Sequence, residues 1–419
     1  MKILRSPDKA ITSYLSMQQV EEGYDYKLNN YVIKDGNIYY NTLTDEGVFV
    51  EDFEADKLAL IKRWFLVPDV VDIKTIAHAI RQKRLYSKLG PGSQLKQNFV
   101  IFTTTACNAS CEYCFEKTYD TITMSEETAK DVADYIIKMS SVKKPKLRWF
   151  GGEPLVNKKA MNIINERLLA NGMDYWSEIS TNGDLFPKCS DEEIISWKPR
   201  IIQFTVDAVG EEYDKIKGLP AEAYERLKET IVRLGKILPN CRVNIRVHLN
   251  PVKGPDVCYK IIDDFVRFKN VKIYARILYH SAKLKDYKDL LKIEDYILLR
   301  GGHESFRQPF GYVTHCMADN SRIACINPNG ELSPCEHYAF GEYMYGSIYK
   351  KDKDQNILRK WSIREKYTNP SCNECVLYPL CRKIVMCPAE GKCSDGYQYY
   401  QIETIKRALR KKVEEIGGN

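Results

Sequence analysis

The sequence has no cysteine before Cys107, no long apolar run and only a small excess of one charge. Nowhere do about 18 apolar residues follow one another, so we expect no transmembrane helix and no membrane partner. The basic residues of the opening segment MKILRSPDKAITSY have no apolar stretch behind them, so no signal peptide is predicted. We therefore expect a cytoplasmic protein.

Charge and composition indicate an ordinary globular chain. Lys and Arg number 63 against 56 Asp and Glu, a net charge of +7. An excess of this size could favour an acidic peptide or a nucleic acid, but it is typical of a solvated surface, and we expect no nucleic-acid partner. With 419 residues, 44% of them hydrophobic, the chain can bury a substantial core in two or three domains.

The cysteines are unevenly distributed. Three of the fourteen fall within residues 107–114, eight fall between 316 and 393, and Cys189, Cys241 and Cys258 are scattered. A reducing compartment disfavours a disulfide framework, so metal sites are the leading interpretation of the two groups. The scattered three have no partner spacing and are predicted to be ordinary core thiols.

Residues 1–92 predict a small α+β domain. The segments YVIKD and NIYYNT alternate in polarity and meet at Gly36-Asn37, a typical hairpin turn. Residues 54–65 and 71–86 have apolar side chains at helical spacing, and 87–94 has the Gly and Pro content of a linker.

Residues 93–285 predict strands alternating with helices. The apolar run 98–105 is typical of a strand buried on both faces, and Ser125 is expected to cap a helix. Right-handed crossovers between such strands give an α/β fold, a partial (β/α)6 TIM-like barrel, with the active site at the carboxyl ends of the strands. Further strands are expected at 147–150, 178–181, 201–207, 243–249 and 271–278, and further helices near 157–170, 221–237 and 256–267.

Residues 286–419 have less regular patterning and are rich in Cys, Gly, Pro and Tyr. This composition predicts a domain organised by metal, ending in a charged helix near 400–415.

The first cysteine group has the spacing of a cluster-binding loop. Cys107, Cys111 and Cys114 form a CxxxCxxC run directly after the first barrel strand. Three thiolates on one loop can hold three corners of a [4Fe–4S] cluster and leave one iron open. A zinc knot is the alternative, although zinc loops usually pair their cysteines as CxxC.

With Tyr113 before the third cysteine, this run resembles the motif of the radical S-adenosylmethionine (SAM) superfamily. The resemblance implies that SAM binds the open iron and is cleaved to a 5′-deoxyadenosyl radical. It also implies SAM contacts for residues at the ends of the second and third strands, which here are Gly151, Gly152, Glu153 and Pro154, and Ser180 and Asn182. Asp207 matches a position where the family often has Asp, but Ala208 and Lys217 depart from the family pattern.

The second cysteine group resembles the SPASM extension, which carries up to two auxiliary [4Fe–4S] clusters. That resemblance implies three [4Fe–4S] clusters in all. A zinc ribbon over 372–393 is the alternative, and the Cys381–Cys387 spacing is longer than is common in the family. The implied ligands are Cys316, Cys335 and Cys387 for auxiliary cluster I, and Cys372, Cys375, Cys381 and Cys393 for auxiliary cluster II.

Cys325 has two interpretations of equal weight. The segment INPNGEL (326–332) is predicted to form a hairpin that brings Cys325 near Cys335, where it could be the fourth ligand of auxiliary cluster I. It could equally be a buried strand residue. His315 and His337 flank implied ligands and are expected to support the site rather than to bind iron.

The resemblance implies a maturase that cross-links or oxidises side chains of a ribosomally made precursor peptide. A sulfatase-type maturase that forms formylglycine is the alternative enzyme, and a cluster-binding electron carrier or sensor is the alternative without catalysis. The implied partners are a precursor peptide with a leader segment and an electron donor such as flavodoxin or ferredoxin. Residues 1–92 could bind the leader by strand addition, or could simply cap the barrel.

Overall fold

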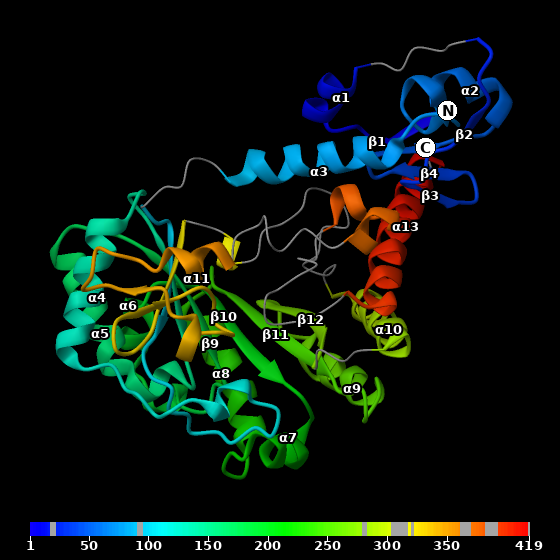
Figure 1. Cartoon of the computed structure of the whole chain (residues 1–419). Helices are drawn as coiled ribbons and strands as arrows, with labels where there is room; N and C mark the ends of the chain where they lie inside the picture. The colour runs from blue at the N-terminus through cyan, green and yellow to red at the C-terminus, as the bar shows by residue number, and fades with distance from the viewer. Residues whose placement is uncertain are drawn as a thin grey trace. The chain divides into compact units, whose positions relative to one another are not determined.

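A computed structural model describes residues 1–16, 22–89, 95–278, 283–302, 317–319, 322–360, 370–381 and 393–417. The chain divides into two compact units (Figure 1). One unit combines Met1–Gly90, Arg307–Cys316 and Ile363–Asn419, and the other combines Pro91–Phe306 and Met317–Ser362. The first is here called the terminal unit and the second the barrel unit.

The barrel unit contains six parallel strands in sequence order. Strands β7 to β12 lie side by side, and each is paired in parallel with the next. Their bounds are β7 Asn98–Phe102, β8 Lys146–Phe150, β9 Trp176–Thr181, β10 Pro199–Val206, β11 Arg242–Leu249 and β12 Val271–Ile277. This confirms the predicted α/β fold with a mostly parallel sheet, since each predicted strand is present.

Helices connect these strands as the sequence pattern predicts. Ser125 caps the first of them, because its side chain accepts a hydrogen bond from the Thr128 backbone N–H. The helices are α4 Glu126–Met139, α5 Lys158–Ala170, α6 Asp191–Ser196, α7 Gly210–Lys217, α8 Ala223–Ile237, α9 Asp256–Phe265 and α10 Leu284–Leu299.

Three short strands extend this sheet beyond β7. Strand β13 (Ile323–Ile326) pairs in parallel with β7, and β14 (Glu331–Ser333) and β15 (Gly346–Ser347) follow it. The antiparallel pair β13–β14 confirms the hairpin predicted for INPNGEL. Helix α11 (Gln355–Lys360) follows β15. The Cys-rich region therefore contributes strands directly to the sheet that carries the first cysteine group.

The terminal unit joins the two ends of the described chain. Its four-stranded antiparallel sheet has the order β1-β5-β4-β3, and β3 and β4 form the predicted hairpin. The bounds are β1 Lys2–Arg5, α1 Lys9–Leu15, β2 Tyr26–Leu28, β3 Val32–Asp35, β4 Ile38–Asn41, β5 Glu46–Phe49, α2 Phe53–Lys62, β6 Leu66–Pro68, α3 Ile73–Leu89 and α13 Asp395–Gly417.

Helix α13 packs against this sheet. Leu409 is 1% exposed and shares one apolar cluster with Leu4, Ile33 and Tyr40. Arg410 at its side donates to Asp35 of β3 at 2.6 Å. These contacts tie the C-terminal helix to the N-terminal strands. Figure 1 shows α13 next to β3 and β4.

Replacing Leu409 with alanine is expected to destabilise the terminal unit. The change leaves a cavity under the sheet, and such changes cost about 2–5 kcal/mol of unfolding free energy. Leu58→Ala is the matched control, since Leu58 lies on α2 with 52% of its surface exposed. Denaturant unfolding of both variants measures the difference. Equal stabilities would show that α13 is not part of the core of this unit.

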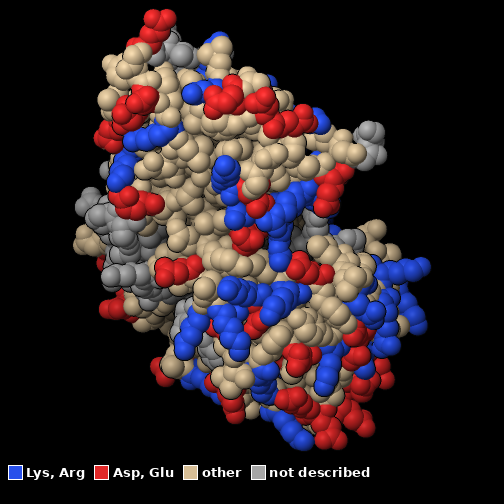
Figure 2. All heavy atoms as spheres, turned by 90° about the vertical axis from the view of Figure 1, so that its right-hand side faces the viewer, with Lys and Arg blue, Asp and Glu red and all other residues tan. Residues whose placement is uncertain are grey.

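The surface carries charges of both signs. Lys and Arg side chains are interspersed with Asp and Glu on the face drawn in Figure 2. Among the helices of the described ranges, none is long and apolar enough to cross a membrane.

Candidate functional site

The three cysteines of the CxxxCxxC run lie on the loop after β7. Cys107 is exposed, while Cys111 and Cys114 are partly buried. The loop is anchored to the end of α7, because the Ser110 backbone N–H donates to the carbonyl oxygen of Lys217 at 2.7 Å. Gly218 has a φ of +60°, and a Cβ there would lie 1.9 Å from Ser110 Oγ. Glycine is therefore required where α7 meets the cysteine loop.

The thiols of this loop influence one another. Desolvation raises the pKa of Cys107 to about 12, and Glu153, Cys111 and Cys114 contribute to the rise. Three thiols gathered on one loop fit an iron–sulfur cluster, whose positive charge would stabilise the thiolates. Within the described part of the chain, no three His, Cys, Asp or Glu side chains are already arranged as a complete metal site.

The segment after β8 packs against the backbone that leads into Cys107. A Cβ on Gly151 would lie 2.1 Å from the carbonyl oxygen of Thr104, and one on Gly152 would lie 2.3 Å from that of Ala106. Two backbone hydrogen bonds hold the two segments together. They run from Gly152 N to Thr104 O (3.1 Å) and from Glu153 N to Ala106 O (2.9 Å). The two glycines thus allow a close approach between two strand ends.

Glu153 links the second strand end to the third. Its buried carboxylate accepts hydrogen bonds from Thr181 Oγ1 and the Asn182 backbone N–H, both at 2.8 Å, and from the Leu155 N–H at 3.1 Å. Burial raises the pKa of Glu153 to about 7, and these hydrogen bonds oppose the rise. Both carboxylate oxygens therefore have partners within the chain, and a contact of Glu153 with SAM stays a prediction.

Asn182 connects the third strand end to the cysteine loop. Its side-chain amide donates to Asn108 Oδ1 at 2.8 Å and lies 3.9 Å from Cys107 Sγ. Ser180 lies on β9, two residues before Asn182. Its hydroxyl is 3.5 Å from the guanidinium group of Arg148. Pro154 begins a short 3-10 helix, Pro154–Asn157, that Glu153 caps. The structure thus brings together the cysteine loop and the two predicted segments.

A buried polar network lies next to this site. Asp207, just after β10, pairs with Lys217 Nζ at 2.6 Å and with His248 Nδ1 at 2.7 Å. Tyr113 donates its hydroxyl proton to Asp207 and accepts from Lys217 at 2.6 Å. Burial alone would raise the pKa of Asp207, but Lys217 and His248 hold it well below its usual range. Burial lowers the pKa of His248, which favours its neutral form.

Sequence analysis missed His248. The signal was its place at the carboxyl end of the strand VNIRVHL, two positions after Arg246 on the same face. It also left Asp207 without a role. The structure shows that Lys217, although it departs from the family pattern, supplies the cation that neutralises Asp207.

The second cysteine group falls partly outside the described residues, which exclude Cys316, Cys387 and His315. Cys325 is a buried residue of β13, 1% exposed. Burial raises its pKa, and Glu336 and Cys335 add to the rise, so Cys325 and Cys335 lie within electrostatic reach of each other. Either predicted interpretation of Cys325 is compatible with this position.

The cysteines that were predicted for auxiliary cluster II lie in the terminal unit. Backbone hydrogen bonds join Cys375 N to Cys372 O (2.9 Å) and Cys381 N to Tyr378 O (3.4 Å). Burial raises the pKa of Cys372 to about 11, and Cys381 adds to the rise. The Cys393 thiol is 3.7 Å from the Ser394 carbonyl oxygen. Their assignment as cluster ligands stays a prediction. The scattered Cys189, Cys241 and Cys258 are buried, as predicted for core thiols.

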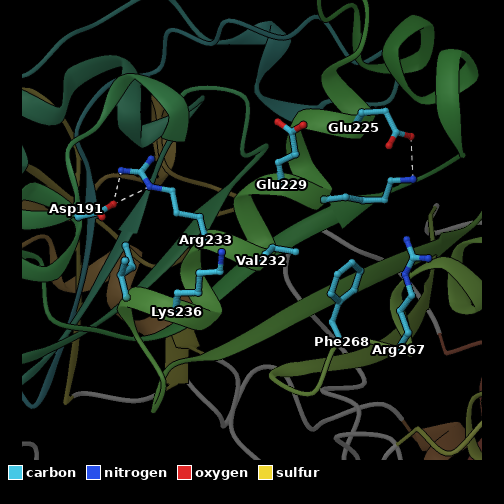
Figure 3. Close-up of a pocket in the computed structure, with 10 residues that line it drawn as sticks. Asp191, Glu225, Glu229, Val232, Arg233, Lys236, Arg267 and Phe268 are labelled. Atoms are coloured by element: carbon cyan, nitrogen blue, oxygen red, sulfur yellow. Dashed lines mark hydrogen bonds and ion pairs between the residues drawn. The ribbon is translucent and has the colours of Figure 1, made fainter.

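A separate pocket of about 490 Å³ lies beside α8 (Figure 3). Two pairs of opposite charge lie in its lining: Arg233 with Asp191 at 2.6 Å, and Lys228 with Glu225 at 2.8 Å. It contains none of the predicted site residues. We therefore place the functional site at the strand ends and not in this pocket.

Residues 101–268 match the radical SAM superfamily. They are a radical SAM domain. A probable GTP 3′,8-cyclase from Methanococcus aeolicus is 25% identical over 269 residues, covering 62% of this chain and 86% of the relative. A GTP 3′,8-cyclase from Clostridium perfringens is 23% identical over 295 residues, covering 63% and 86%.

Solved structures share the fold of the radical SAM domain and its surroundings. Native anSMEcpe with bound AdoMet has a TM-score of 0.57 at 15% identity and covers 77% of this chain and 100% of its own. Streptococcus suis SuiB bound to the precursor peptide SuiA has a TM-score of 0.53 at 15% identity and covers 91% of this chain and 99% of its own. At these identities the likeness concerns the fold.

Proposed function

We propose that this protein is a radical SAM maturase that cross-links or oxidises side chains of a ribosomally synthesised precursor peptide. The observation that carries the proposal is the meeting of the Cys107–Cys114 loop with the Glu153 and Asn182 segments at adjacent strand ends of a radical SAM domain. A [4Fe–4S] cluster on Cys107, Cys111 and Cys114 would bind SAM and supply a 5′-deoxyadenosyl radical.

Two features outside the radical SAM domain support a peptide as the substrate. The GTP cyclase relatives align with 62% and 63% of this chain, whereas the SuiB fold extends over 91% of it. Outside residues 101–268 the chain has an antiparallel sheet whose edge strands are β1 and β3. An extended leader peptide could add a strand to one of these edges.

The residues around the site would hold the cofactors in place. Asn182 and Asn108 fix the cysteine loop against the third strand end, and Glu153 holds that strand end to the second. The Asp207 network fixes the ring of Tyr113 beside the loop. Flavodoxin or ferredoxin is the proposed source of electrons, and the remaining late cysteines are the proposed ligands of two further clusters.

The test is a reaction with peptides encoded beside this gene. Reduced, reconstituted protein is incubated with SAM and each peptide, and 5′-deoxyadenosine and peptide mass are measured. Loss of two hydrogens supports a cross-link, and loss of the product after Cys blocking identifies a thioether. Conversion of a Cys or Ser to an aldehyde would instead select the formylglycine-forming alternative, which the likeness to anSMEcpe structures with bound peptides favours. Turnover of GTP and of no peptide would reject both.

Iron and sulfide content tests the cluster assignment. Three [4Fe–4S] clusters predict about twelve irons and about twelve sulfides per chain after anaerobic reconstitution. About four irons together with stoichiometric zinc would contradict the two auxiliary clusters and favour a zinc ribbon.

A further inference from the structure

One face of β11 carries three buried polar atoms without partners. Asn244, Arg246 and His248 alternate along the strand with Val243, Ile245 and Val247, which are fully buried on the other face. Asn244 Oδ1, Arg246 Nε and His248 Nε2 each have no hydrogen-bond partner in the structure. An unsatisfied buried polar group costs about 1–3 kcal/mol, so three in a row on one strand call for an explanation.

This face lines the hollow of the curved sheet. Arg246 is in register with Thr205 of β10 and with Tyr274 of β12. The Tyr274 hydroxyl reaches across β11 and donates to Gln203 of β10, two positions before Thr205 on the same face. Tyr113, on the loop after β7, packs against His248 of β11 with the ring centroids 5.7 Å apart. In a flat sheet four strand spacings would separate β7 from β11 by about 19 Å, so the sheet curls and this face of β11 points into its hollow.

Positive charge is in excess on the inward face of β11. The nearby carboxylates already have cationic partners: Glu178 pairs with Lys146 and Arg148, and Asp207 pairs with Lys217. Arg246 forms no ion pair with any carboxylate among the residues that the structure describes. An arginine held in this position is suited to an anionic partner that comes from outside the chain.

We propose that the inward face of β11 binds an acidic residue of the substrate peptide. Arg246 donates to the carboxylate, and Asn244 Oδ1 accepts the backbone N–H of the same residue. The two side chains are two positions apart on a strand, about 7 Å, so one amino-acid residue can reach both. This inference rests on the proposed peptide substrate and names the chemistry by which that peptide is held.

His248 places this site relative to the cysteine loop. It stands two positions beyond Arg246 towards the carboxyl end of β11, and its ring lies edge-on to Tyr113 with the ring centroids 5.7 Å apart. A peptide held by Arg246 therefore enters the hollow below the cysteine loop. The acidic residue would lie close to the side chain that is modified.

The test compares peptides that differ only in charge. Reconstituted protein with SAM is titrated by calorimetry with Ac-Gly-Glu-Gly-NH2, Ac-Gly-Gln-Gly-NH2 and Ac-Gly-Gln-Gly-OH. The Glu peptide should bind at least about tenfold more tightly than the neutral one, as a charge-assisted hydrogen bond requires. The third peptide shows whether a C-terminal carboxylate can replace the side chain.

Variants of Arg246 test whether this side chain causes the preference for the negatively charged peptide. Arg246→Gln should abolish the preference for the charged peptide, and Arg246→Lys should restore part of it. Arg267→Gln is the matched control, since Arg267 is an exposed arginine just after α9. Arg246→Gln should also melt no lower than the native protein, because it removes a partly buried charge that pairs with no carboxylate of the described residues. A structural role predicts a lower melting temperature.

Four results would overturn the proposal. Equal affinity for the charged and neutral peptides in the native protein would remove its basis. Weaker SAM binding by Arg246→Gln would assign the arginine to the cofactor, and tight GTP binding that this variant loses would assign it to a nucleotide. Peptide modification without charge preference would reject this inference and leave the proposed function standing.

Discussion

Replacing Cys111 with alanine should abolish 5′-deoxyadenosine formation, with a loss of at least about a thousandfold. Cys111 is the central thiol of the loop, and two cysteines cannot hold the three corners of a cluster that leaves one iron open. The change should also remove about four irons per chain. Iron analysis and chromatography of the nucleoside product measure both effects.

Cys241→Ala is the matched control for this experiment. Cys241 is buried just before β11, at the opposite end of the strand from the site, so its loss should leave iron content and product formation unchanged. A Cys111→Ala protein that keeps its iron and still makes 5′-deoxyadenosine would exclude the loop as the cluster site. A zinc knot predicts loss of zinc and not of iron.

Gly152→Ala is expected to disrupt the site through the backbone. The new Cβ would lie 2.3 Å from the carbonyl oxygen of Ala106 and 2.4 Å from that of Thr105. Both atoms belong to the chain segment that leads into Cys107, so the segment must move away. Overpacking of this kind costs about 1–3 kcal/mol of unfolding free energy, and a displacement of about 1 Å at a catalytic site can cost about a hundredfold in rate.

The control for this change is Gly172→Ala. Gly172 has a φ of +71°, but nothing lies within 4 Å of the added Cβ. It should lose about 1–2 kcal/mol from the left-handed backbone and keep its cluster content. If Gly152→Ala also binds a full complement of iron and turns over SAM normally, the close contact between the two strand ends does not position the cysteine loop.

The elements of the radical SAM domain could be predicted because their signals are local. Apolar runs mark the buried parallel strands, and Ser125 with its first-turn acids marks the start of α4. The hairpin at Gly36-Asn37 and that at 326–332 follow from turn chemistry. The site segments could be placed because parallel strands put their carboxyl ends at one edge of the sheet.

The parts that sequence analysis missed depend on contacts between distant residues. Nothing local indicates that Ile323–Ile326 pairs with β7, since a short apolar strand can join any sheet edge. The role of Glu153 was also obscured, because its partners Thr181 and Asn182 lie on another strand. His248 belongs to the site because its ring nitrogen is hydrogen-bonded to Asp207, which lies 41 positions earlier in the chain.

The joining of Leu4 and Tyr40 to Leu409 also constrains the order of folding. Between the end of β5 at Phe49 and the start of α13 at Asp395, about 345 residues of chain must be made, and long-range contacts of this kind form slowly. The radical SAM domain can complete its core from its own consecutive strands and helices during that interval. The N-terminal sheet must meanwhile leave apolar surface uncovered. We therefore expect the terminal unit of newly made protein to depend on chaperones more than the barrel unit does.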